Sequence, residues 1–122
     1  MILPSFFAPA SFTRLYAKYR AQRFSMLDLG RGNHAVRKAK RWFPECSYTG
    51  IDRERYNNDD HDFDLMDLFH QIDLEDATAL SVLPDASYDV LIMSHVLEHL
   101  KQGHAALEAL FDKVKAGGSA YL

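Results

Sequence analysis

Residues 26–34 read MLDLGRGNH. The short, mainly apolar run MLDL is followed by two glycines, Gly30 and Gly32, that are separated by one residue. The run is typical of a buried strand, and Val36, Ala39 and Phe43 recur after it at helical spacing until Pro44 ends the pattern. Two glycines between a strand and a helix permit a tight turn and let a ligand lie against bare backbone. The segment therefore predicts a strand–turn–helix unit with a ligand site at the turn.

Apolar strands and helical patterns alternate on both sides of this unit. We predict helices over residues 11–22, 33–43, 96–100 and 105–114, and strands over residues 25–29, 48–51, 69–72, 88–93 and 119–122. The polar, acidic residues 53–67 favour a solvated loop or a short helix, and the glycine pair at 117–118 predicts a turn. Strands that are apolar on both faces imply a parallel sheet covered by helices. The predicted fold class is α/β, a Rossmann-like three-layer sandwich with a mostly parallel five-strand sheet.

Length and composition limit what this chain can do. Its 122 residues suffice for one domain, and 48% hydrophobic with 25% charged residues argues against disorder. A net charge of −3 gives no electrostatic reason to bind nucleic acid, and the single Cys46 excludes a disulfide framework. No apolar run approaches the roughly 20 residues that span a bilayer. The first ten residues, MILPSFFAPA, carry no basic charge before the apolar stretch, so the cytoplasm is the expected location.

A second acid strengthens the ligand site. Asp52 ends the next predicted strand, 20 residues after Gly32, where an acid can accept hydrogen bonds from a ribose diol. The pattern Gly30-x-Gly32-x-x-Ala35 also fits a dinucleotide fingerprint, so NAD stays open as a ligand. Asp28, two residues before Gly30, would repel a pyrophosphate but suits a cationic ligand that carries an amine. This charge favours S-adenosylmethionine over NAD.

Five ordered segments resemble the class I S-adenosylmethionine-dependent methyltransferases, especially their small-molecule branch: MLDLGRGNH, YTGID, IDLED, LPDASYDVLIMSHVLEHL and AGGSAYL. The resemblance runs from about Met26 to Leu122. It implies a leader and helix over residues 1–24, followed by an incomplete S-adenosylmethionine-binding domain over residues 25–122. The family's sheet usually has seven strands, so this chain is expected to lack the last two.

The resemblance also implies roles for individual residues. The methionine part of the cofactor would touch Asp28, Gly30 and Gly32; the ribose hydroxyls would bind Asp52; the adenine would meet Arg53, Asp73 and the backbone N–H of Leu74; and Ser94 would lie under the cofactor. One departure concerns His34, which stands where the family often has a third glycine or another small residue.

His95 is the candidate catalytic base, because it follows the fourth strand and a histidine titrates near neutral pH. The run His-Val-Leu-Glu-His at 95–99 also matches an inverted zinc-protease motif, but few residues follow that could supply a third ligand. Some family members bind a divalent ion through a Glu-x-x-Glu-His run, in which His95 here replaces the first Glu. We therefore expect no metal, and favour helix packing for this run.

The preferred function is methyl transfer from S-adenosylmethionine to a small-molecule acceptor. The alternatives are a non-catalytic cofactor-binding fragment or inactive homologue, an NAD-binding oxidoreductase domain, and an interaction module without a ligand. The fifth strand would form an exposed sheet edge, which a dimer contact or a partner could cover.

Overall fold

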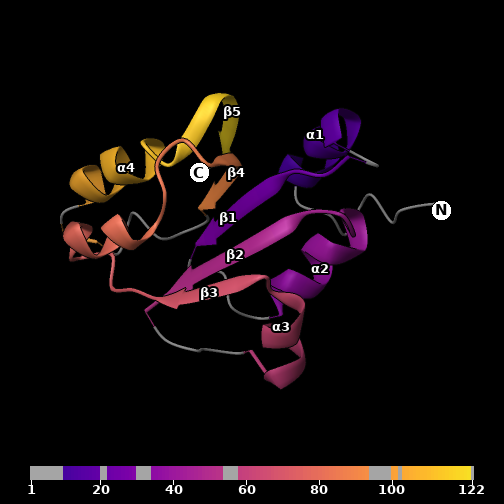
Figure 1. Ribbon diagram of the computed structural model, residues 1–122, viewed down its shortest axis with the longest axis horizontal. Coiled ribbons are helices and arrows are strands. Elements are labelled where there is room, and N and C mark those ends of the chain that lie inside the picture. The colour runs from indigo at the N-terminus through magenta and orange to yellow at the C-terminus, as the bar shows by residue number, and fades with distance from the viewer. Residues whose placement is uncertain are drawn as a thin grey trace.

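The computed structural model describes residues 10–19, 22–29, 34–53, 58–93, 100–101 and 103–121 (Figure 1). Helices and strands alternate along them in the order α1 (Ala10–Tyr19), β1 (Ser25–Leu29), α2 (Ala35–Trp42), β2 (Ser47–Asp52), α3 (Asp60–Leu65), β3 (Leu68–Gln71), the 3-10 helix η2 (Ala77–Val82), β4 (Tyr88–Met93), α4 (Gly103–Phe111) and β5 (Val114–Tyr121). None of the helices in this part of the chain has the length and apolar character needed to cross a bilayer.

The five strands form one sheet in the order β3-β2-β1-β4-β5, and every neighbouring pair is parallel. β1 lies at the centre, with Leu27, Leu29 and Met26 completely buried. The predicted α/β class with a five-strand parallel sheet is confirmed. Since strands in a parallel sheet all point the same way, the carboxyl ends of β1, β2 and β3 lie along one edge, where ligands of such sheets bind.

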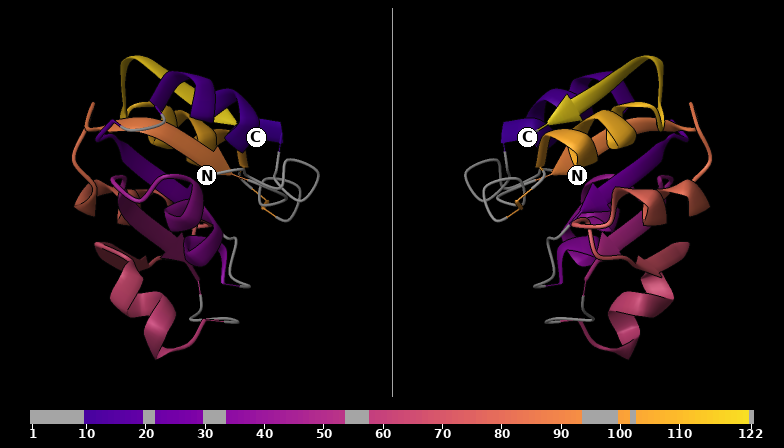
Figure 2. Two further views of the ribbon diagram at one scale, coloured as in Figure 1. Left: turned by 90° about the vertical axis from the view of Figure 1, so that its right-hand side faces the viewer. Right: turned by 90° about the vertical axis from the view of Figure 1, so that its left-hand side faces the viewer.

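Helices cover both faces of the sheet, so the fold has three layers. Figure 2 shows α1 and α2 in front of the sheet in one view and η2 and α4 in front of it in the opposite view. The first core joins Leu15 and Tyr19 of α1 to Val36 of α2 and Met26 of β1. The second core contains Leu80 and Leu83 of η2, Leu110 of α4, and Leu27 and Leu91 from the sheet. The residues of α1 thus share a core with the sheet.

The last strand differs from its prediction. The helix expected to reach Val114 ends at Phe111, and Val114 already belongs to β5. The glycine pair at 117–118 lies inside β5 instead of forming a turn before it. Tyr88 pairs with Val114 and Val90 with Ser119, so β5 uses more residues than β4 over the same stretch. The extra residues form a bulge in β5. Gly117 permits this bulge because its φ is 81°, a conformation that glycine adopts without strain.

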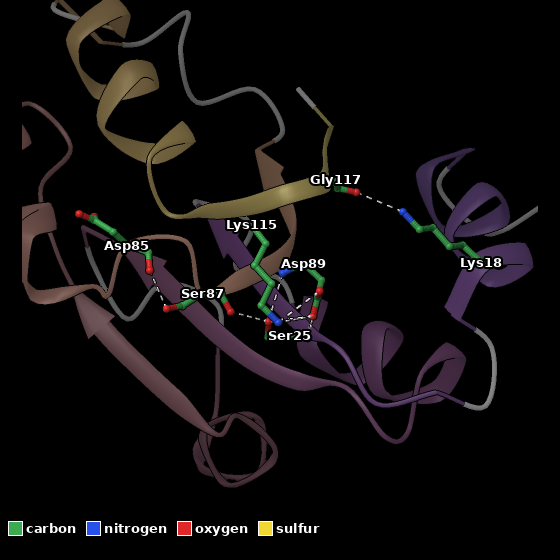
Figure 3. A network of polar contacts seen from close by, with 7 residues as sticks. All are labelled: Lys18, Ser25, Asp85, Ser87, Asp89, Lys115 and Gly117. Carbon is green, nitrogen blue, oxygen red and sulfur yellow. Dashed lines mark hydrogen bonds and ion pairs between the residues drawn. The ribbon is translucent and has the colours of Figure 1, made fainter.

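A polar network joins β1 to β4 at the amino ends of the strands (Figure 3). The carboxylate of Asp89 accepts hydrogen bonds from the backbone N–H of Ser25 at 2.9 Å and from its hydroxyl at 3.2 Å. Lys115 of β5 lies 3.4 Å from the same carboxylate. These contacts outweigh the effect of partial burial and lower the pKa of Asp89. The network fixes the relative position of three strands at the edge opposite the predicted ligand site.

Candidate functional site

The two acids of the predicted cofactor site lie at the carboxyl ends of neighbouring strands. Asp28 of β1 pairs in register with Gly50 of β2, and Asp52 follows two residues later. Because side chains alternate along a strand, Asp28 and Asp52 face the same side of the sheet. That side is the one covered by α2, as the burial of Met26 and Tyr48 against Val36 shows.

Tyr48 is the polar partner of Asp28. Its phenol donates a 2.6 Å hydrogen bond to Oδ2 of Asp28, and both side chains are buried. A carboxylate in this position is tolerated only when hydrogen bonds replace the water it has lost. The sequence reasoning missed Tyr48, although one signal was present: Tyr48 lies two residues before Gly50 on the same face of β2.

Gly50 lies beside these acids, and neighbouring side chains pack closely over it. A Cβ at this position would lie 3.1 Å from Sδ of Met66 and 3.4 Å from both the Phe69 and Tyr48 rings. A narrow pocket opens here, with a volume of about 10 Å³, which is roughly the room for one water. Its lining comes from β1, β2, β3, the start of α2 and the residues around α3: Asp28, Ala35, Tyr48, Gly50, Ile51, Asp52, Asn58, Met66 and Phe69. Both acids line this pocket, and a nucleoside would have to widen it.

The remaining described residues of the predicted site do not line this pocket. Asp73 is exposed just beyond β3, and its Oδ1 accepts a 3.0 Å hydrogen bond from the backbone N–H of Glu75. Leu74 is buried in the second core, and Arg53 is exposed after β2. The end of β2 lies beside the end of β3, because the N–H of Ile72 donates to the carbonyl of Asp52 at 2.9 Å.

Four predicted site residues fall outside the described part of the chain: Gly30, Gly32, Ser94 and His95. The same holds for Glu98 and His99, the other polar residues of the His-x-x-Glu-His run. Their roles stay predictions from the sequence.

The acidic residues 59–64 are not simply a solvated loop. Asp59 caps α3 by accepting a hydrogen bond from the N–H of Asp62 at 3.0 Å, and the Asp62 side chain accepts from the N–H of Asp59 at 2.9 Å. The bond from the Asp62 N–H and the nearby Arg37 guanidinium lower the pKa of Asp59. Asp62 itself is fully buried, and it contacts His34 and Arg37 of the neighbouring α2 segment.

A wider depression of about 590 Å³ lies at the opposite edge of the sheet, around the amino ends of β1 and β2. Its charged groups are paired with one another: Lys40 lies 3.0 Å from Asp67, and Lys115 lies 3.4 Å from Asp89. The smaller pocket is the candidate site, because ligands of parallel sheets bind beyond the carboxyl ends of the strands.

Comparison with known families shows the family to which this fold belongs. The profile of the family described as "Methyltransferase domain" matches residues 6–122, which is nearly the whole chain. The chain belongs to this methyltransferase family. The predicted resemblance is thereby confirmed for the family, and the matched residues include those of α1 as well as those of the sheet.

Solved structures resemble this methyltransferase domain over most of its length. A putative S-adenosyl-L-methionine-dependent methyltransferase from Methanococcus maripaludis has a TM-score of 0.67 at 16% identity, and the match covers 90% of this chain and 52% of that one. MycE methyltransferase of the mycinamycin biosynthetic pathway, solved with Mg and SAH, has a TM-score of 0.68 at 28% identity over 94% of this chain and 31% of that one. The CurJ carbon methyltransferase has a TM-score of 0.67 at 18% identity over 88% of this chain and 31% of that one.

The chain thus spans 31% to 52% of the length of these solved structures. No curated protein matches its sequence.

Proposed function

We propose that this chain is the cofactor-binding part of an S-adenosylmethionine-dependent methyltransferase that acts on a small molecule. One observation carries the proposal: Asp28 and Asp52, at the ends of two adjacent strands, line the same pocket at the carboxyl edge of the parallel sheet. Family membership and the bound SAH in the MycE structures support the same cofactor class.

The two acids would divide the ligand between them. Asp52 lies near the surface at the end of β2, where its carboxylate can accept hydrogen bonds from both hydroxyls of a ribose. Asp28 lies deeper and brings negative charge into the pocket, which suits the cationic, amine-bearing end of the cofactor. S-adenosylmethionine supplies an electrophilic methyl group on its sulfonium sulfur when bound.

The protein's contribution to the reaction would be alignment of the acceptor with the methyl group, together with removal of a proton where the acceptor requires it. His95 remains our candidate for that proton transfer, with Ser94 under the cofactor. The glycines at 30 and 32 remain the proposed contacts to the methionine part, and Arg53, Asp73 and Leu74 the proposed contacts to the adenine. A small-molecule acceptor, a dimer or partner along β5, and a cytoplasmic location belong to this proposal as well.

Titration calorimetry with S-adenosylmethionine, SAH and NAD tests the cofactor class. We expect micromolar binding of the first two and no heat from NAD. Heat from NAD alone would favour the oxidoreductase alternative and contradict the proposal. Binding of SAH without methylation of any small-molecule acceptor would favour the non-catalytic alternative.

Asp52→Asn tests the site itself. The substitution keeps the shape of the side chain and removes the charge that accepts from the ribose, so SAH binding should weaken by about 1.5–3 kcal/mol. The matched control is Asp112→Asn, which changes an exposed acid beyond α4 and should leave the affinity unchanged. Equal affinities for the two variants would show that Asp52 does not hold the ligand.

A further inference from the structure

His34 occupies a backbone conformation that usually belongs to glycine. Its φ is 60° and its ψ is 28°, which is the left-handed region. Residues other than glycine enter this region at a cost, and histidine does so more often than most. His34 directly precedes Ala35, which begins α2 and lines the pocket that contains Asp28 and Asp52. The conformation of His34 therefore sets how α2 begins beside this pocket.

The side chain of His34 is held by Asp62 of α3. Nδ1 of His34 lies in close contact with Oδ2 of Asp62. The two partners differ in exposure, because the His34 side chain is 47% exposed and the Asp62 side chain is fully buried. Asp62 is therefore the fixed partner of the pair, and the imidazole is the group that it restrains.

Asp62 is itself fixed from several sides. Its Oδ1 lies 2.8 Å from Nε of Arg37, and its Oδ2 accepts a 2.9 Å hydrogen bond from the backbone N–H of Asp59. Arg37 also contacts Asp59, the N-cap of α3, at 2.6 Å, so that one guanidinium joins Asp59 and Asp62 to α2. A buried carboxylate held in this way has one defined position. It can transmit that position to His34.

We propose that Asp62 is a positioning residue for the cofactor site. By restraining His34 it supports the left-handed conformation before α2, and so it takes over the task that a glycine performs without help. The inference rests on the proposed function, since the pocket that it supports is the proposed S-adenosylmethionine site.

A metal site is the competing interpretation of the same cluster. His34, Asp59 and Asp62 offer ligand atoms that lie within 4.8 Å of one another. The positive charge among them is already supplied by Arg37, which is paired with both carboxylates. The cluster therefore works as an ion-paired clamp between α2 and α3.

The test uses the wild type and the variants Asp62→Asn, His34→Gly and the double variant, each measured for SAH affinity by calorimetry and for amide hydrogen exchange at residues 34–37. We expect Asp62→Asn to weaken SAH binding about tenfold and to speed exchange, since the left-handed conformation loses its support. His34→Gly should bind like the wild type. In the double variant, affinity should return to within about twofold of that of His34→Gly, since glycine needs no partner in this conformation.

Asp60→Asn is the matched control on the same helix, because Asp60 is exposed in the first turn of α3. A purely structural role for Asp62 would lower the free energy of unfolding and leave the SAH affinity of the folded protein unchanged, which would overturn the proposal. An affinity loss in Asp62→Asn that glycine at position 34 does not restore would overturn it too.

If Asp62→Asn does not fold, His34→Ala and His34→Gly replace it. Alanine removes the contact with Asp62 and disfavours the left-handed region, so the alanine variant should bind SAH more weakly than the glycine variant. Equal binding would contradict the proposal. A wild type that binds neither S-adenosylmethionine nor SAH would contradict the proposed function, and the exchange rates would then decide whether Asp62 holds His34.

Discussion

The phenol of Tyr48 and the carboxylate of Asp28, on adjacent strands, are joined by a 2.6 Å hydrogen bond inside the core beneath α2. The register explains how they meet: Asp28 pairs with Gly50, which has no side chain to separate the Tyr48 ring from the acid. The same glycine lines the narrow pocket beside Asp28, under the side chains of Met66 and Phe69. The absence of a side chain at position 50 thus lets the surrounding side chains pack close together.

Replacing Tyr48 by phenylalanine should destabilise the fold. The variant keeps the ring and removes a donor to a buried carboxylate, so the free energy of unfolding should fall by about 1.5–3 kcal/mol. Urea denaturation measures the change. Tyr16→Phe is the matched control, since it keeps the ring contact with Trp42, whose centroid lies 5.7 Å away. An unchanged unfolding midpoint for Tyr48→Phe would show that the bond to Asp28 contributes nothing to stability.

The bulge in β5 contains Gly117 and Gly118, and we expect alanine to destabilise the fold at both positions. A Cβ at Gly118 would lie 2.8 Å from the carbonyl oxygen of Asp89 and 2.9 Å from that of Lys115. Backbone atoms cannot move aside as a flexible side chain can, so Gly118→Ala should lower the free energy of unfolding by about 1–3 kcal/mol.

In Gly117→Ala the added Cβ would have no atom within 4 Å. The free energy of unfolding should still fall by about 1–2 kcal/mol, because alanine disfavours the positive φ at this position. Ala116→Ser, at the exposed neighbouring position, is the control that should change little. The three unfolding midpoints by urea denaturation distinguish these effects. A glycine-to-alanine variant as stable as the wild type would contradict the corresponding reason.

Cys46 should react slowly with alkylating reagents while the protein is folded. Burial raises the pKa of its thiol from 9.0 to about 11, which reduces the reactive thiolate near neutral pH about a hundredfold. Mass spectrometry after timed exposure to iodoacetamide measures the rate, and the same protein in urea is the control. Equal rates in the folded and unfolded protein would show that the thiol is accessible and unshifted.

Two acids near the amino ends of the strands, Asp67 and Asp89, lead us to expect that the protein loses stability at low pH. Partial burial would raise the pKa of Asp67, but the N–H of Tyr48 and the ammonium of Lys40 outweigh it and lower that pKa below 3.8. The contacts around Asp89 lower its pKa in the same way. A carboxyl whose pKa is lower in the folded state stabilises the fold above the unfolded pKa, and the contribution disappears as the pH falls through the folded value.

Urea midpoints across a pH series test this expectation. The wild type should lose stability as the pH falls below about 4. Asp67→Asn should be less stable at pH 7 and should lose less on acidification, whereas Asp60→Asn should follow the wild type. A pH dependence in Asp67→Asn identical to that of the wild type would rule out Asp67 as a source of the acid effect.

The parallel sheet could be predicted from the sequence because its central strands are apolar on both faces, as in residues 25–29 and 88–93. The site could be predicted only where a residue ends a strand, as Asp28 and Asp52 do. Contacts between elements distant in the sequence could not be predicted, because they depend on how the elements pair and pack. The bond from Tyr48 depends on the register of β2, and the burial of Asp62 depends on His34 and Arg37 of another segment.

Glycine was the other source of error, since its meaning depends on its neighbours. The glycine pair at 117–118 predicts a turn by composition. In the structure Gly117 lies in the bulge within β5, and the strand pairs with β4 again from Ser119 onward. In the opposite sense, α2 begins at Ala35 and not at residue 33, because His34 takes a conformation that its residue type does not predict.

The central position of β1 has a consequence for the order in which this protein can fold. No two strands of the described sheet are joined by a hairpin, because all of them are parallel. β1 pairs on one side with β2, which follows it closely in the sequence. On its other side β1 pairs with β4, and there Met26 is in register with Val90, far along the chain. Contacts between such distant residues form slowly, because the chain loses the entropy of closing a long loop before the contacts contribute any stability. During synthesis the edge of β1 that pairs with β4 therefore stays unpaired until β4 has emerged. An unpaired strand edge of this kind is able to pair with another chain.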